Sequence, residues 1–128
     1  MKGIEIRRAH FPGRAGIDAY GNGGFRFAEM SHRGDLLCLP SGVHGWSVGD
    51  PLALLPNDFA MVLAEAQKIE ILLVGMGRDP RRLPAETRAA LREAGIAVDA
   101  MTTGAAVRTY NVLLAEDRAV AAGLIAVE

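Results

Sequence analysis

The stretch from Ile69 to Val74 constrains the fold of this chain most strongly. It reads Ile-Glu-Ile-Leu-Leu-Val, and its last four residues are all apolar. A strand with apolar side chains on both faces is typical of the middle of a sheet that other elements cover on both sides. The stretch therefore predicts a covered sheet, and the rest of the chain must supply its neighbouring strands and its covering helices.

The second half of the chain alternates helical and strand patterns around this stretch. Asn57 or Asp58 can cap a helix that carries apolar residues at helical spacing through residue 66. Pro84 suits the first turn of a second helix and Gly95 suits its end. We expect further strands at residues 96–98 and 119–125, and a third helix at residues 101–114. Helices alternating with buried strands predict a layered α/β domain.

The first half of the chain has β patterns. Residues 17–20 and 25–27 flank Gly21-Asn-Gly-Gly24, and Asn-Gly between alternating runs is a strong hairpin signal. A second turn at residues 32–35 leads into an apolar strand, and further extended pieces are expected around Ile4 and Ile6 and at residues 36–39 and 43–46. We expect these hairpins to extend or flank the main sheet. The whole chain, residues 1–128, is expected to form one domain.

Composition narrows the class of protein. The net charge is -1, so no overall positive charge draws the chain to nucleic acid. Cys38 is the only cysteine, which excludes an internal disulfide and fits a reducing compartment. No apolar run approaches the roughly 20 residues that span a bilayer, and the first residues lack a signal-peptide core. We therefore expect a cytoplasmic protein without a membrane span.

The loop after the predicted buried strand is one candidate site. It reads Gly75-Met-Gly-Arg-Asp-Pro-Arg-Arg, and amides in a glycine loop can bind an anion with help from Arg78. Gly75 and Gly77 lack the third glycine of a dinucleotide loop, and no Gly-Lys-Ser/Thr ending follows. A tight surface loop with solvated arginines is the simpler interpretation.

Other motifs for chemistry are weak. Arg88 and Arg92 could join the loop arginines Arg78, Arg81 and Arg82 in a basic patch that binds nucleic acid, but a solvated helix face explains them better. The spacing of His10, His32, His44 and Cys38 matches no zinc pattern, so we expect no metal or other cofactor. No Gly-x-Ser-x-Gly motif or nucleophile–base pair is recognisable.

The strongest candidate is the helix predicted at residues 101–114. Thr103 can cap it, and Arg108, Tyr110 and Asn111 bring polar groups among small and apolar neighbours. These groups could line a cleft, and the cleft would comprise Tyr20, His44, Trp46, Thr103, Arg108, Tyr110 and Asn111. The alternative is structural: Arg108 would pair with a carboxylate, and Tyr110 and Asn111 would bond backbone groups of neighbouring loops.

An ordered set of segments in this chain resembles the Mth-like domain family of uncharacterised proteins. The segments are Ile17-Asp-Ala-Tyr-Gly with Gly24-Phe25, Leu39-Pro-Ser-Gly-Val-His-Gly-Trp46, Leu72-Leu-Val-Gly-Met-Gly77, Leu83-Pro through Leu91, Gly95-Ile-Ala-Val, Met101-Thr-Thr-Gly-Ala-Ala and Arg108-Thr-Tyr-Asn-Val-Leu-Leu-Ala-Glu. Together they cover nearly the whole chain from about Ile17 onward. The family includes a mitochondrial complex I assembly factor and an adipogenesis-associated protein.

The resemblance implies a three-layer α/β fold with a central mixed sheet and a β extension. It implies no enzymatic activity but a protein partner, with a role in assembling a respiratory or membrane complex. Val107 stands where many members carry a cysteine, which argues against a thiol-dependent role here. A small-ligand binder or enzyme using the cleft beside Thr103, and a homodimer, stay open as alternatives.

Overall fold

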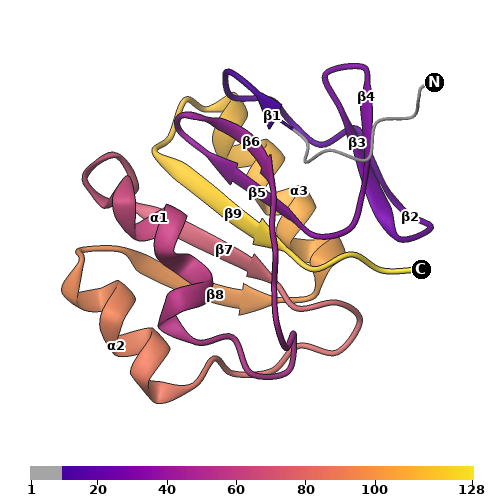
Figure 1. Ribbon diagram of the computed structural model, residues 1–128. Coiled ribbons are helices and arrows are strands. Elements are labelled where there is room, and N and C mark those ends of the chain that lie inside the picture. The colour runs from indigo at the N-terminus through magenta and orange to yellow at the C-terminus, as the bar shows by residue number, and fades with distance from the viewer. Residues whose placement is uncertain (1–9) are drawn as a thin grey trace.

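A computed structural model describes residues 10–128 and confirms a layered α/β fold (Figure 1). A six-stranded mixed sheet lies in the middle. The helices α1 (Ala60–Ala64) and α2 (Ala85–Glu93) cover one face, and α3 (Thr103–Ala115) covers the other. A separate three-stranded sheet packs beside α3. The strand pattern around Ile4 and Ile6 lies outside the described residues.

The strand order of the main sheet explains why helices cover both faces. The order is β1 (His10–Phe11), β6 (Gly42–Gly45), β5 (Leu36–Leu39), β9 (Val120–Leu124), β7 (Ile71–Gly75) and β8 (Ala97–Met101). The strands β9, β7 and β8 are parallel, and β5 joins β9 in antiparallel pairing. The chain steps outward from β7 to β8 and then returns past β7 to β9. Right-handed crossovers in opposite directions place α2 and α3 on opposite faces.

The stretch that predicted a covered sheet is indeed the central parallel strand. On β7, Leu72 and Val74 pack toward α1 and α2, whereas Leu73 packs toward α3. All three side chains are buried, which follows from the alternation of side chains along a strand with helices on both faces.

The small sheet confirms the predicted Asn-Gly hairpin. It consists of β2 (Ala19–Gly21), β3 (Gly24–Phe27) and β4 (Met30–Arg33), all antiparallel. Asn22 and Gly23 have φ values of 53° and 79°, as the two central residues of this hairpin turn require. Phe25 and Phe27 point into the core beneath α3, so the sheet is anchored by one apolar face.

The first predicted helix is shorter and more irregular than its pattern indicated. A 3₁₀ turn η1 (Pro56–Phe59) precedes α1, and a second 3₁₀ turn η2 (Ala66–Lys68) follows it. The predicted caps at Asn57 and Asp58 are wrong, because the turn begins at Pro56, whose fixed φ and missing N–H suit a first position. The Asp58 carboxylate instead accepts the N–H of Leu55.

Candidate functional site

The start of α3 is held by two adjacent threonines with different roles. The side chain of Thr102 accepts the N–H of Ala105 and caps the helix, so the prediction of Thr103 as the cap is wrong. Thr103 is fully buried in the first turn. Its Oγ1 donates to the carbonyl of Ile125 over 2.6 Å and accepts the N–H of Gly77 over 2.9 Å. Thr103 thus joins the segments that follow β7 and β9.

These bonds use groups that an anion site in the glycine loop would need. The N–H of Met76 donates to Met101, and the N–H of Gly77 donates to Thr103. The closest atom to a Cβ built on Gly75 is the Thr103 Cα, at 2.9 Å, so this glycine allows close packing of β7 on α3. Arg78 donates to the carbonyl of Glu128. The anion site at Gly75, Gly77 and Arg78 stays a prediction, with two of its amides already engaged internally.

Asn111 and Tyr110 bond the backbone of a segment far away in sequence. Asn111 Oδ1 accepts the N–H of Ile17 over 2.8 Å, and its Nδ2 donates to the carbonyl of Ile17 over 2.9 Å. The Tyr110 hydroxyl donates to the carbonyl of Ala15 over 3.5 Å. The structural alternative is therefore confirmed for both residues, which hold residues 15–17 against α3.

Replacing Asn111 with alanine is expected to lower the free energy of unfolding by about 1–2 kcal/mol, because both partly buried backbone groups of Ile17 lose their partner. Chemical denaturation followed by circular dichroism measures the change. The matched control is Val112→Ala, because Val112 is the next residue on the helix and is exposed. Equal stability of the Asn111 and Val112 variants would contradict the structural role.

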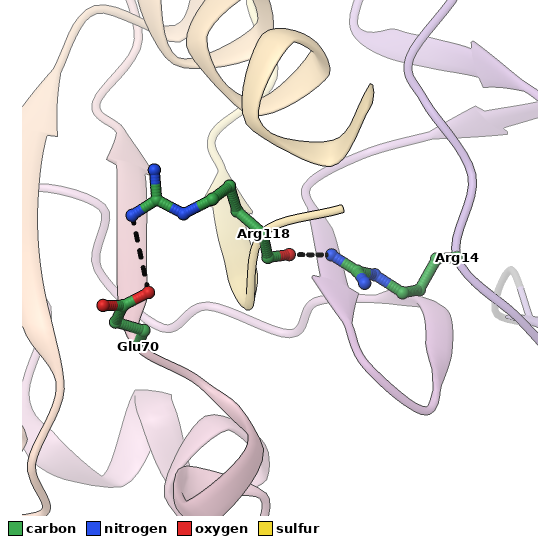
Figure 2. Close-up of polar contacts among 3 residues, drawn as sticks. All are labelled: Arg14, Glu70 and Arg118. Carbon is green, nitrogen blue, oxygen red and sulfur yellow. Dashed lines mark hydrogen bonds and ion pairs between the residues drawn. The ribbon is translucent and has the colours of Figure 1, made fainter. Parts of the chain in front are cut away.

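The same N-terminal segment is tied to the opposite end of α3 by arginines (Figure 2). A guanidinium nitrogen of Arg14 donates to the carbonyl of Arg118, and its other terminal nitrogen lies 3.7 Å from Asp117. The Arg118 side chain in turn lies 3.5 Å from Glu70, just before β7. These exposed ion pairs contribute little energy individually. The contacts of Arg14 hold the start of this segment near the end of α3.

Beneath this segment, Tyr110 lies beside the only cysteine. Burial raises the pKa of the Cys38 thiol from 9.0 to about 12, and burial likewise raises the pKa of the Tyr110 hydroxyl. Val107 is buried in the same cluster, so its side chain serves packing. Because the folded pKa of Cys38 is the higher one, its contribution to stability is complete below pH 9 and falls as the pH rises from 9 toward 12.

Cys38 in the folded protein is expected to be inert toward a thiol reagent such as an aromatic disulfide at pH 8. The raised pKa leaves about a thousandfold less thiolate than a free cysteine would have, and the sulfur is buried as well. Absorbance of the released thiolate measures the rate. Unfolding the chain in denaturant is the control, and it should expose one fast-reacting thiol. Fast labelling without denaturant would contradict this prediction.

The residues of the predicted cleft lie on opposite faces of the main sheet. Trp46 packs on the face covered by α1 and α2, where its ring lies 5.5 Å from that of Phe59 and its Nε1–H donates to Asp58. His44 lies two residues earlier on the same face and contacts Ser41 over 3.3 Å. Tyr110 is buried on the other face. The grouping of Trp46 and His44 with the α3 residues is therefore wrong.

Tyr20 and Arg108 remain on the surface at the start of α3. A Cβ built on Gly104 would clash with the Tyr20 hydroxyl and would lie 3.6 Å from a guanidinium nitrogen of Arg108, so both side chains lie over this glycine. Arg108 is exposed, and it has no ion-pair partner among residues 10–128, so the predicted pairing with a carboxylate is wrong. The two residues form a small exposed pair rather than the wall of a buried site.

The structure shows a hollow elsewhere, at the outer edge of the main sheet. Its volume is about 370 Å³, and its lining residues come from the loop before α2, from α2 and from β8. They are Pro80, Arg81, Arg82, Leu83, Arg88, Val98, Asp99 and Ala100. Arg88 donates from Nε to the carbonyl of Leu83 over 3.1 Å. Within the described part of the chain, Arg81, Arg82 and Asp99 have neither a hydrogen bond nor an ion pair of their side chains. We call this region the arginine hollow.

The sequence predicted a group of arginines but not the hollow. The prediction of a solvated helix face holds for Arg92, which is exposed and lies outside the hollow. The sequence pattern does not show that residues 98–100 line a hollow. They do so because β8 is the last strand of the sheet, and strand order is not visible in a local pattern. Among residues 10–128, no three His, Cys, Asp or Glu side chains gather to hold a metal ion.

The fold and these two regions define a small three-layer α/β domain with an arginine hollow at one sheet edge and an internally bonded polar segment on α3. Residues 17–125 match the model of a family described as proteins of unknown function, DUF498/DUF598. The chain belongs to this family. A solution structure from Bordetella pertussis, described as an Mth938-like domain, has 28% sequence identity and a TM-score of 0.76, covering 88% of this chain and 85% of that one. The resemblance to Mth-like domains is thus confirmed.

The chain is also similar to two further proteins whose names describe a location or a role. A crystal structure described as an outer membrane protein from Bartonella henselae has 60% sequence identity and a TM-score of 0.89, covering 93% of this chain and all 100% of that one. The mouse protein named NADH dehydrogenase [ubiquinone] 1 alpha subcomplex assembly factor 3 is 33% identical over 122 residues. That match covers 95% of this chain and 66% of the mouse protein, so the chain spans just under two thirds of it.

Proposed function

We propose that this chain is a protein-interaction domain that assists assembly of a respiratory complex, the NADH dehydrogenase, without catalysing a reaction itself. The observation that carries the proposal is the 33% identity to the mouse assembly factor across 95% of this chain. Similarity over that length spans nearly the whole chain rather than one short segment. We also propose that residues 1–128 form one domain.

The polar residues of α3 support an interaction role over a catalytic one. The side chains of Thr103, Tyr110 and Asn111 form hydrogen bonds to backbone groups within the fold. A catalytic group must instead reach a substrate within hydrogen-bond distance. Arg108 is exposed without a polar partner among the described residues, which suits a contact with another protein.

We further propose that the domain works in the cytoplasm, on the side where subunits of such a complex are made. Cys38 is a buried free thiol, which a reducing compartment preserves. Among residues 10–128, no helix is long and apolar enough to cross a membrane.

Deleting the gene in the source organism tests this function. We expect less fully assembled NADH dehydrogenase on native gels, accumulation of partial assemblies, and restoration by the wild-type chain. A chain carrying Val112→Ala serves as the control, because this exposed apolar residue has no assigned role and the variant should restore assembly. An unchanged amount of assembled complex in the deletion strain would overturn the proposal.

A further inference from the structure

We propose that an extended acidic segment of a partner protein binds along the outer edge of β8, with its carboxylates against Arg81, Arg82 and Arg88. The inference deepens the proposed function and rests on it, because the segment would belong to the protein that this chain assists. Three features of the arginine hollow carry it: an unpaired strand edge, a shape that reaches this edge, and an excess of positive charge.

The first feature is the free edge of β8. This strand pairs only with β7 among the described residues. The N–H of Ala97 donates to Glu70, and the carbonyl of Met101 accepts from Met76, so these two residues direct their backbone toward β7. Backbone groups alternate in direction along a strand, so those of Val98 and Ala100 point outward. An extended peptide can pair with such groups and add a strand to the sheet.

The second feature is the position of the hollow. Val98, Asp99 and Ala100 are consecutive, and all three line it. Because successive side chains of a strand point to opposite faces, a hollow on one face would meet only alternate residues. Contact with three in a row places it along the strand's edge. Val98 and Ala100 also pack partly against the core, so the edge is firmly held.

The third feature is charge. Arg81, Arg82 and Arg88 outnumber Asp99, which is the only acidic residue that lines the hollow. Arg81 and Arg82 are exposed and have no polar partner among residues 10–128. A guanidinium matches a carboxylate with two parallel hydrogen bonds. An acidic segment would therefore be held by its backbone on β8 and by its side chains on the arginines.

Two other occupants fit less well. Single-stranded nucleic acid is usually held by aromatic side chains on which its bases stack, and no aromatic residue lines the hollow. A second copy of this chain, paired through its own β8, would bring one set of arginines against another. Like charges at close range oppose that arrangement. The combination of strand edge and arginines favours an acidic peptide.

Nuclear magnetic resonance of the full ¹⁵N-labelled chain tests the inference. The probe is a synthetic peptide in which glutamate alternates with threonine, because this pattern favours an extended strand. We expect amide shifts centred on Val98 and Ala100 together with shifts of the side-chain signals of Arg81, Arg82 and Arg88. The same peptide with lysine in place of glutamate should bind at least tenfold more weakly.

Two further comparisons separate the contributions of backbone and charge. A glutamate peptide methylated at alternate backbone nitrogens should lose the shifts at Val98 and Ala100, because it cannot pair with the strand. The double variant Arg81→Glu with Arg82→Glu should weaken binding by roughly tenfold or more, whereas Arg92→Glu, on α2 and outside the hollow, should not. Equal binding of the methylated peptide or of the lysine peptide would overturn the proposal.

Two more outcomes would also overturn it: shifts that fall outside the hollow, and tighter binding at β8 of a single-stranded oligonucleotide than of the acidic peptide. This titration uses the purified chain and does not depend on a cellular phenotype. Peptide binding at β8 without any defect in the deletion strain would refute the assembly role alone. An assembly defect that the double arginine variant still corrects would refute the role of the hollow alone.

Discussion

Replacing Trp46 with alanine is expected to lower the free energy of unfolding by about 3–5 kcal/mol. The indole is only 7% exposed, lies against Phe59, and rests on the backbone of β9. A Cβ built on Gly123 would come within 2.9 Å of the ring, so the glycine leaves room for it. The substitution removes this contact surface and leaves the carbonyl of Asp58 without its donor.

A second variant separates packing from hydrogen bonding. Trp46→Phe keeps an aromatic ring and loses the Nε1–H, so we expect a loss of only about 1–2 kcal/mol. Denaturation followed by circular dichroism measures both variants, since Trp46 is the only tryptophan and its fluorescence disappears with it. If the alanine variant unfolded at the same denaturant concentration as the wild type, Trp46 would not be part of the core. It would then be free to line a cleft, as the sequence predicted.

The class of fold could be predicted because local patterns carried enough information. The apolar run from Ile69 to Val74 indicated a strand covered on both faces, and it became β7. Asn22 and Gly23 predicted a hairpin, since few other residues accept positive φ at both positions. Gly95, with φ of 85°, ends α2 as predicted. Each signal depends on residues close together in sequence.

The prediction of one cleft was wrong because it depended on which face of the sheet each of its residues lies on. Trp46 and Tyr110 belong to opposite faces, and this follows from the place of β6 in the strand order and from the handedness of the crossovers. Neither property is visible in a local pattern. The arginine hollow has the same origin, since Arg81 and Asp99 meet only because β8 is the outermost strand.

The roles of the polar residues of α3 were also difficult to predict from the sequence. Their chemistry alone fits a binding site as well as an internal network, since buried polar groups need partners in either case. The structural alternative required Asn111 to bond Ile17, 94 residues earlier in the chain. Helical spacing does place Thr103, Ala106, Val107 and Tyr110 on one buried stripe. Arg108 lies outside that stripe, so its exposure could have been predicted.

Thr103→Val is expected to lower the free energy of unfolding by about 2–4 kcal/mol. Valine keeps the shape of threonine but lacks the hydroxyl, so the N–H of Gly77 and the carbonyl of Ile125 both lose their partner. Thr103 is fully buried, so water cannot readily replace the lost bonds. Urea denaturation measures the change in stability, and hydrogen exchange should show faster exchange of the Gly77 amide.

The appropriate control is Thr109→Val, because Thr109 lies on the same helix, is half-buried, and has no side-chain partner among the described residues. It makes the same chemical change without breaking a bond, so a shift within about 0.5 kcal/mol is expected. Thr103→Ser should retain most of the stability, since the serine hydroxyl can make both bonds. If Thr103→Val and Thr109→Val were equally stable, Thr103 would not join β7 to β9, and its hydroxyl would be available for a ligand instead.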